Sequence, residues 1–451
     1  MKTVSLSLIS SFLLATTTFG ATLSKDLLES SLVVYHGAVA LVHEKRHLHV
    51  NSEDQQIVYE GVANTIETDS VNVLLPSGIT LNSQQFRYDK LTRSKLLEAH
   101  IGKEVQAKIL QHPDTYETLK VTLLSHEGDT CMVTTPQRKI MSVPSAQILF
   151  SSIPDELITK PSLVWNIRTD QTHDATMSLD YLIGNISWKS DYILNLGNND
   201  ANLSGWITID NRSGKAFKQT RLHVLAGNIN RITQTQPRYK AAMLNRTTAE
   251  TAVTHVAHEG YHFYSIPFTV TLANNEKTQI KFMDLQNLHV SRRYDVTLSN
   301  PSYFHGEQEH SVNQYVHIDG LNVPLPKGVV RTYAASSRQH ILLGESSMPP
   351  LAKQQPVDLR LGDNFDVKVK ETTLQRDDDK RYFQATLRYS ITNSSDHNKT
   401  IELLVPFQNQ KKNSIDTTMP YSIKQGNLVS FTLNVAANNT QKFDVSFRGK
   451  R

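Results

Sequence analysis

The segment His258-Glu259-Gly260-Tyr261-His262 has the residue types and the spacing of the zinc-hydrolase motif H-E-x-x-H. On an α-helix, residues i and i+4 share one face, so both histidine rings could bind the same zinc ion. The glutamate between them could then act as a general base on a zinc-bound water molecule. The segment is therefore compatible with a metal-dependent hydrolase, provided that it is helical.

The residues around this motif have the period of a strand. Apolar side chains occur at every second position, at Tyr264, Ile266, Phe268, Val270 and Leu272. Gly260 lies inside the motif and Pro267 follows it, and both disfavour a helix. On a strand, His258 and His262 would be roughly 13 Å apart at ~3.3 Å per residue. We therefore predict that neither histidine is a zinc ligand, and keep the hydrolase as an alternative.

Other residues that could bind a metal ion have weaker patterns. His43, His47 and His49 lie close together, but no second set of ligands with metal-site spacing follows them. We interpret them as exposed strand residues. The Asp377–Asp379 run lacks the spaced ligands of a calcium loop and suits a hairpin tip. With neither a G-x-S-x-G motif nor a phosphate-binding loop, we predict no catalytic, cofactor-binding or metal-binding residue, and no enzymatic activity.

Composition and the N-terminus point to an exported protein. The formal net charge is +4 over 451 residues, without a basic block, which gives no indication of nucleic-acid binding. Lys2 precedes an apolar run, and small residues follow at Gly20 and Ala21, which predicts a signal peptide over residues 1–21. No later stretch has the ~18 apolar residues of a membrane span. We expect a periplasmic or extracellular mature chain without a transmembrane segment.

The hydrophobic pattern predicts an all-β protein of several stacked β domains with one short helix. We expect an N-terminal β region over residues 22–93, a short helix and an SH3-like barrel over 94–152, a central β-sandwich over 160–345, and an immunoglobulin-like β-sandwich over 360–451. Ser94 is expected to cap the helix and Gly102 to end it. The single cysteine, Cys131, is expected to be a buried small hydrophobe.

Two strands are expected at the centre of the 160–345 domain, joined as a hairpin. Residues 206–210 alternate in character, and so do residues 222–226. The turn between them contains Asn211-Arg-Ser-Gly214, where glycine can take a positive φ. Residues 234–248 are polar and irregular and are expected to form a loop.

The C-terminal part shows the clearest alternation. Apolar residues occupy every second position in four runs, which begin at Phe365, Phe383, Val429 and Phe443. One-sided burial of this kind is typical of an immunoglobulin-like sandwich. We expect residues 365–448 to fold alone.

Short segments along nearly all of the mature chain resemble one known family. They include Val34-Tyr-His-Gly37, Phe86-Arg-Tyr-Asp89, Ser187-Trp-Lys-Ser-Asp-Tyr192, Gly205-Trp-Ile-Thr-Ile-Asp-Asn-Arg-Ser-Gly214, Val323-Pro-Leu-Pro-Lys-Gly-Val-Val-Arg-Thr-Tyr333 and Leu361-Gly-Asp-Asn-Phe-Asp-Val367. The chain resembles bacterial exported proteins of a domain family of unknown function that includes the mucoidy-inhibitor-like proteins. The resemblance implies an all-β envelope protein without assigned catalytic residues. Many relatives carry a long coiled coil, for which this chain has no heptad pattern.

The sequence favours a non-enzymatic, exported cell-envelope protein that acts as an interaction or scaffold module. Its partner would be an envelope protein or a glycan. Two alternatives remain open. One is the metal-dependent hydrolase that uses residues 258–262. The other is a carbohydrate-binding protein that uses Trp188 or Trp206 as a stacking platform.

Overall fold

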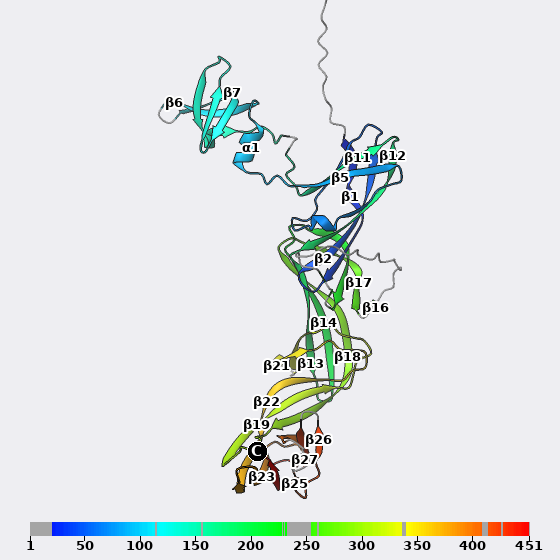
Figure 1. Ribbon diagram of the computed structural model, residues 1–451, viewed down its shortest axis with the longest axis vertical. Coiled ribbons are helices and arrows are strands. Elements are labelled where there is room, and N and C mark those ends of the chain that lie inside the picture. Colours follow the sequence, from blue (N-terminus) through cyan, green and yellow to red (C-terminus); the bar gives the residue numbers. More distant parts are fainter. Residues whose placement is uncertain are drawn as a thin grey trace, which may run out of the picture. The chain divides into compact units, whose positions relative to one another are not determined.

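The computed structural model describes residues 20–112, 115–154, 157–227, 229, 231, 254–258, 261–335, 340–407, 414–424 and 427–450. Within these residues the chain is almost entirely β, with several sheets and one α-helix (Figure 1), which confirms the predicted fold class. The chain divides into two compact units. The first comprises Met1–Ser187, Asp210–Ala249 and Ser265–Lys277, and the second comprises Trp188–Ile209, Glu250–Tyr264 and Thr278–Arg451.

The first sheet has ten strands. These are β1 (Gly20–Tyr35), β2 (Val39–Val50), β3 (Gln56–Glu60), β4 (Asn72–Leu74), β5 (Ile79–Arg87), β11 (Ser162–Thr169), β12 (His173–Gly184), β15 (Phe217–Ala226), β16 (Thr254–His258) and β17 (Tyr261–Leu272). Its main strand order is β16-β17-β15-β1-β2-β12-β4, and β1 pairs with β15 in parallel. A short 3₁₀ helix, Thr68–Ser70, precedes β4. Alternate residues of β2 are buried, as the period of two requires for a sheet with one covered face.

A small domain is inserted between β5 and β11, which pair directly with each other. It contains α1 (Arg93–Ala99), β6 (Glu104–His112), β7 (Thr115–Glu127), β8 (Thr130–Thr134), β9 (Ile140–Pro144), a 3₁₀ turn (Ser145–Gln147) and β10 (Ile148–Leu149). Its five-stranded sheet has the order β10-β6-β7-β8-β9 and its own apolar core. Cys131 is fully buried in that core, as predicted.

The predicted helix cap was placed two residues too late. Thr92, in an extended conformation, is the N-cap of α1, and its side chain accepts a hydrogen bond from the backbone N–H of Lys95 at 3.3 Å. That N–H would otherwise lack a partner in the first helical turn. Ser94 is therefore the second residue of the helix and not its cap.

The other large sheet has thirteen strands. These are β13 (Ile186–Leu196), β14 (Asp200–Asn211), β18 (Glu276–Thr297), β19 (Glu307–Ile318), β20 (Gly328–Ala335), β21 (His340–Met348), β22 (Val357–Asp378), β23 (Tyr382–Asn393), β24 (Lys399–Pro406), β25 (Ser414–Asp416), β26 (Ser422–Lys424), β27 (Leu428–Val435) and β28 (Asn439–Lys450). Its main order is β21-β20-β13-β14-β18-β19-β22-β23-β28-β25. A branch leaves β18 through β24 and continues to β27 and β26.

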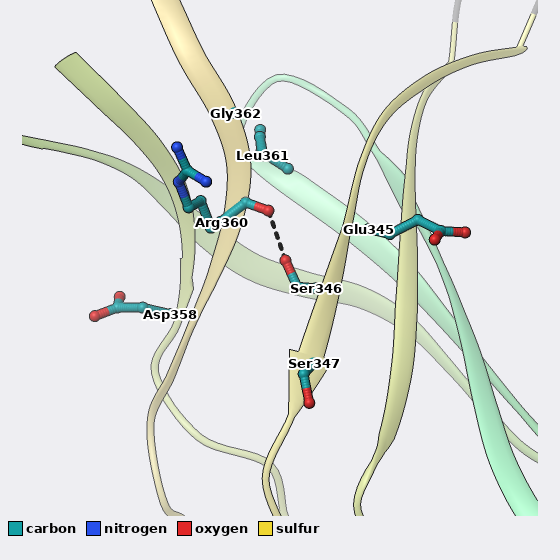
Figure 2. A pocket seen from close by; sticks show the side chains of 7 residues that line it. All are labelled: Glu345, Ser346, Ser347, Asp358, Arg360, Leu361 and Gly362. Carbon is teal, nitrogen blue, oxygen red and sulfur yellow. Dashed lines mark hydrogen bonds between the residues drawn. The ribbon is translucent and has the colours of Figure 1, made fainter. Parts of the chain in front are cut away.

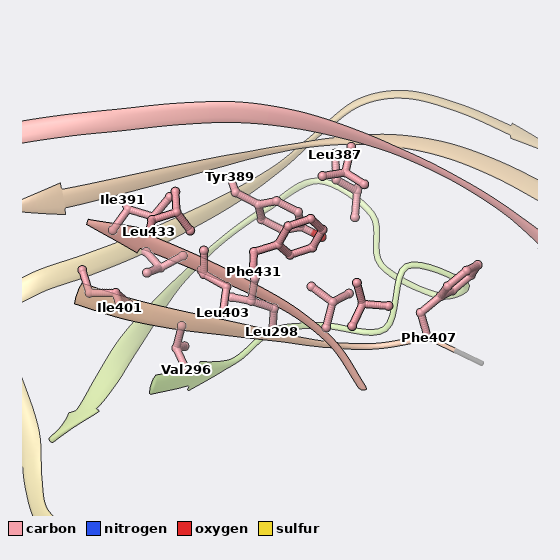
Figure 3. Packing of buried hydrophobic residues seen from close by; sticks show 14 of the residues in the cluster. Val296, Leu298, Leu387, Tyr389, Ile391, Ile401, Leu403, Phe407, Phe431 and Leu433 are labelled. Atoms are coloured by element: carbon pink, nitrogen blue, oxygen red, sulfur yellow. The ribbon is translucent and has the colours of Figure 1, made fainter. Parts of the chain in front are cut away.

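The C-terminal sandwich begins before residue 360, so the expected boundary divides its core. Figure 3 shows Val296 and Leu298 in the same cluster as Tyr389, Ile401 and Phe431. The cluster also includes Phe304 and Val312. Strand β24 pairs in parallel with the end of β18, from Tyr294↔Ile401 to Thr297↔Leu404. The strands predicted within residues 360–451 are present. The alternation of apolar residues that predicts them cannot show that an earlier strand completes the sheet.

This arrangement corrects the expectation that residues 365–448 fold alone. We now expect that fragment to lack a cooperative thermal transition, because it leaves out four buried core residues and the parallel partner of β24. A fragment spanning residues 289–451 is expected to melt cooperatively. Circular dichroism during heating of the two purified fragments tests this. A cooperative transition in the shorter fragment would show that β18 and β19 are dispensable.

The predicted strands around Trp206 are present as β14 and β15, but they do not form the expected hairpin. They belong to different sheets. The side-chain amide of Asn211 explains the connection, because it is buried and donates to the carbonyl oxygens of Lys215, Leu272 and Ala273 at 2.9, 3.4 and 3.1 Å. Its Oδ1 accepts from the backbone N–H and the hydroxyl of Ser213 at 3.2 and 2.8 Å. The turn is therefore fixed as an arch between sheets.

The same arch occurs again between β23 and β24. The buried Asn393 donates to the carbonyl oxygens of His397, Val435 and Ala436 at 2.9, 3.1 and 3.1 Å. Its Oδ1 accepts from the backbone N–H and the hydroxyl of Ser395 at 3.1 and 2.7 Å. Each contact has its counterpart at Asn211, so we call these two connections the asparagine arches.

The strand order around the two asparagine arches is also the same. The first has β17-β15-β1-β2-β12 in one sheet and β13-β14-β18 in the other. The second has the continuous order β27-β24-β18-β19-β22-β23-β28. The single strand β22 therefore holds the positions that two strands, β12 and β13, hold in the first. Both contain one parallel pair at the same place, β15 with β1 and β24 with β18. We infer that one strand arrangement occurs twice in the chain, once around each asparagine arch.

Candidate binding surface at strand β21

The described residues of the H-E-x-x-H segment lie in strands and not in the helix that a zinc hydrolase of this type requires. Strand β16 ends at His258, β17 begins at Tyr261, and the two strands are neighbours in the sheet. Glu259 and Gly260 lie outside the described residues, as does the predicted loop over residues 234–248. The strand interpretation of residues 261–272 is confirmed. The absence of zinc binding stays a prediction.

The three histidines of β2 lie on one face of the strand, opposite aspartates of β12. Nδ1 of His43 is 2.6 Å from Oδ1 of Asp180, and Nε2 of His47 is 3.3 Å from Oδ1 of Asp174. His47 and His49 are exposed, as expected, whereas His43 is half-buried, which corrects the prediction for that residue. Over the described ranges, no group of three histidine, cysteine or acidic side chains is placed to hold a metal ion.

One row of residues in the first sheet has the composition of a hydrolytic triad. Ser31 on β1 is directly opposite His43 on β2, which is opposite Asp180 on β12. No sequence pattern indicates this row, because its members are far apart in the chain. No hydrogen bond joins Ser31 to His43, whose Nε2 is buried without a partner among the described residues. Ser31 also pairs with β15, so its strand has partners on both sides and offers no free N–H groups for an oxyanion hole.

Two of the three tryptophans, Trp165 and Trp188, are part of the protein interior. Trp165 is fully buried, and its indole N–H donates to Gln84 at 2.7 Å. Trp188 is only 5% exposed and Trp206 is half-buried. A sugar-stacking platform needs an open aromatic face, and Trp188 does not provide one.

Strand β21 is the end strand of its sheet in the described strand order, and its first half is apolar and exposed. Ile341, Leu342 and Leu343 are 51%, 51% and 37% exposed. Edge strands of soluble proteins are usually protected by charges, proline or a covering segment. The run 341–343 contains none of these residue types. Such an edge offers backbone hydrogen bonds and apolar contacts to another extended chain.

A polar groove follows this exposed run along β21. Figure 2 shows the Ser346 hydroxyl directed toward Arg360 on β22, while the Glu345 carboxylate points away from β22. Ser347, Asp358, Leu361 and Gly362 complete the lining. Its volume is about 320 Å³. The hydroxyl of Ser346 donates to the carbonyl oxygen of Arg360 at 2.5 Å. A Cβ at Gly344 would clash with the carbonyl oxygen of Leu361, so β21 passes close to β22 at this glycine.

The charged side chains of the groove are held by fixed partners. The Arg360 guanidinium donates to Asn313 at 2.9 and 3.2 Å and to Asp363 at 2.8 Å. Asp358 pairs with Arg293 and with Nδ1 of His317, the latter at 2.7 Å. The groove is therefore a preorganised polar surface rather than a set of free catalytic groups.

Strand β5 is a second edge, and it differs from β21 in character. It pairs only with β11 in the described sheet. Its middle is polar, and Ser83 and Gln84 accept hydrogen bonds from Asn166 and Trp165 at 2.7 Å each. These contacts leave β21 as the edge with the more apolar free surface.

The comparisons with known proteins leave the family of this chain open. The scan of the sequence against protein-family models finds no match, and the search of curated proteins finds no significant similarity. Among the described residues, no helix has the length and apolar character needed to cross a membrane.

Proposed function

We propose that the chain is a non-enzymatic, exported cell-envelope protein that binds an extended segment of a partner protein along β21. The observation that carries the proposal is the exposed apolar run of Ile341, Leu342 and Leu343 at the end of a sheet. An added strand would gain backbone hydrogen bonds from the edge and would bury these side chains. The adjoining groove offers hydroxyl groups, Arg360 and acidic side chains for polar contacts at one end of the bound segment.

The N-terminal sequence supports the proposed export of the protein. Lys2, the apolar run and the small residues at Gly20 and Ala21 have the order of a signal peptide. A single cysteine leaves the fold independent of an internal disulfide, so the proposed site rests on sheet packing alone.

A photoreactive amino acid at position 342 tests the proposed surface in intact cells. We expect irradiation to join the full-length protein to one discrete partner, because the partner's strand would lie beside this side chain. The matched control places the same group at Leu374, which is 44% exposed but belongs to β22, between β19 and β23 in the sheet. We expect no adduct there.

The adduct at position 342 should also disappear when the neighbouring Ile341 is changed to lysine, because the charge would resist burial. A product with twice the mass of the chain would identify a second copy as the occupant and would contradict the proposed partner. Equal labelling at positions 342 and 374 would contradict the site.

A further inference from the structure

The second copy of this strand arrangement contains a polar cluster at a corner where the first copy has two buried apolar residues, Ile183 and Phe217. The two copies can be matched through one hydrogen bond in each arch. The backbone N–H of Arg212 donates to the carbonyl oxygen of Asn185 at 2.9 Å, and that of Ser394 donates to Asp366 at 2.7 Å. Asn364 thus takes the place of Ile183, two residues earlier.

The lysine of this cluster also replaces an apolar residue. Lys399 begins β24, six residues after Asn393, and Phe217 begins β15, six residues after Asn211. Ile183 and Phe217 are 0% and 1% exposed. The corner therefore does not need polar side chains to fold, although burying them has a desolvation cost.

The polar side chains are placed for a reaction between an amine and an amide. Nζ of Lys399 lies 3.2 Å from Oδ1 of Asn364 and 3.2 Å from Oδ2 of Asp366. With a C=O bond of ~1.23 Å, Nζ is within roughly 4.4 Å of the Asn364 side-chain carbon. Lys399 and Asn364 are each 9% exposed, and the amine also lies 5.3 Å from the ring centre of Tyr294.

The cluster contains a base, a donor that polarises the carbonyl group and a partner for the leaving nitrogen, the groups that amide transfer requires. Asp366 can take a proton from the Lys399 ammonium and leave a neutral nucleophile. The Asn364 carbonyl oxygen accepts from the backbone N–H of Asp366 at 3.2 Å, which polarises the carbonyl group. The Asn364 Nδ2, which would leave, is held by Gln314 at 2.9 Å.

We propose that Lys399 and Asn364 form an intramolecular isopeptide bond. The Lys399 nitrogen attacks the side-chain carbon of Asn364, and the bond from that carbon to Nδ2 breaks. Asp366 carries two protons in turn from the Lys399 nitrogen to the departing nitrogen, one before the attack and one as the new amide forms. The products are one amide and one ammonium ion, with Asp366 again a carboxylate. The bond would join the start of β24 to the bend of β22 and lock the second asparagine arch to the sheet.

Intact mass spectrometry of the purified mature protein tests this bond directly. We expect the mass to be lower than the sequence requires by one ammonia molecule. Protease digestion should release a branched peptide that joins the segments containing residues 364 and 399. The variants Lys399→Arg and Asp366→Ala are expected to have the full mass, because the first lacks the nucleophile and the second lacks the proton carrier.

The double variant Asn364→Ile with Lys399→Phe reproduces the corner of the first copy and serves as a folding control. It should fold and have its full expected mass. A wild-type mass equal to that of the sequence would overturn the proposal and leave the cluster as an ion pair. A loss of one water molecule would place the bond on Asp366, which also contradicts it. None of these outcomes depends on whether β21 binds a partner.

Discussion

Replacing Lys215 by methionine is expected to lower the free energy of unfolding of the first unit by about 3–5 kcal/mol. The Lys215 ammonium donates to the carboxylate of Glu44, which is 0% exposed, and to the hydroxyl of Tyr181 at 3.1 Å. Glu44 also accepts from the hydroxyl of Tyr59 at 2.7 Å. Methionine would fill much of the space but would leave the Glu44 charge buried without its cation.

The double variant Glu44→Leu with Lys215→Met is expected to regain most of this stability, because it removes both buried charges. Lys120→Met is the surface control, since Lys120 and its partner Glu104 are 70% and 65% exposed at 3.1 Å. That change should cost no more than about 1 kcal/mol. Calorimetry of all three proteins gives the comparison. If Lys215→Met and Lys120→Met shift the unfolding transition equally, the buried pair has no special role.

The same pair predicts a pH dependence. Burial lowers the pKa of Lys215 from its ordinary value of 10.5, and the Glu44 carboxylate partly opposes this effect. The native state therefore releases this proton at a lower pH than the unfolded chain does. Between the lowered pKa and 10.5, the unfolded state binds more protons, so this group makes stability rise with pH. The difference between wild type and Lys215→Met should follow this trend.

Asn393→Asp is the second change with a large expected effect. An aspartate cannot donate to the carbonyl oxygens of His397, Val435 and Ala436, and its charge would face all three. Each buried polar group that loses its partner costs about 1–3 kcal/mol, so we expect a loss on the order of 3–5 kcal/mol. The second unit should then unfold at a lower temperature in a calorimetric scan.

Asn398→Asp is the matched control for this change. Asn398 is exposed, and its Oδ1 accepts from the backbone N–H of Ala437 at 3.1 Å, a role that a carboxylate oxygen can keep. We expect little change in stability. Similar losses in the two variants would mean that the Asn393 amide does not hold the arch.

The strands were predictable from the sequence to the extent that each has one buried face. The alternating runs at Phe383, Val429 and Phe443 all appear in strands of the structure. Their partners were less predictable, because alternation shows which side chains are buried but not which strand lies alongside. The parallel pairing of β24 with β18 joins residues more than one hundred positions apart and has no turn signal.

The asparagine arches share a residue pattern that no single motif contains. Both begin with Asn-x-Ser, at Asn211 and Asn393, and both are completed by a second segment that contains paired asparagines, Asn274-Asn275 and Asn438-Asn439. The recurrence of these asparagines in both segments indicates the duplication. The corner with Asn364 and Lys399 could not be found in this way, because there the two copies differ.

The proposed binding surface could not be predicted from the sequence for a physical reason. Ile341, Leu342 and Leu343 read as an ordinary apolar strand, and only the sheet order shows that β21 lies at an end. The candidate zinc motif at residues 258–262, in contrast, could be assessed from the local hydrophobic pattern. That pattern correctly placed residues 261–272 on a strand.

Hydrogen–deuterium exchange across β21 is the most direct test of the proposed strand addition. The measurement compares the free protein with the complex that is photochemically joined at position 342. We expect backbone amides within residues 341–343 to exchange rapidly in the free protein and to become protected in the complex. The protection is expected because an added strand would supply hydrogen-bond acceptors for these amides. Equal exchange in the free protein and in the complex would contradict binding through the β21 edge.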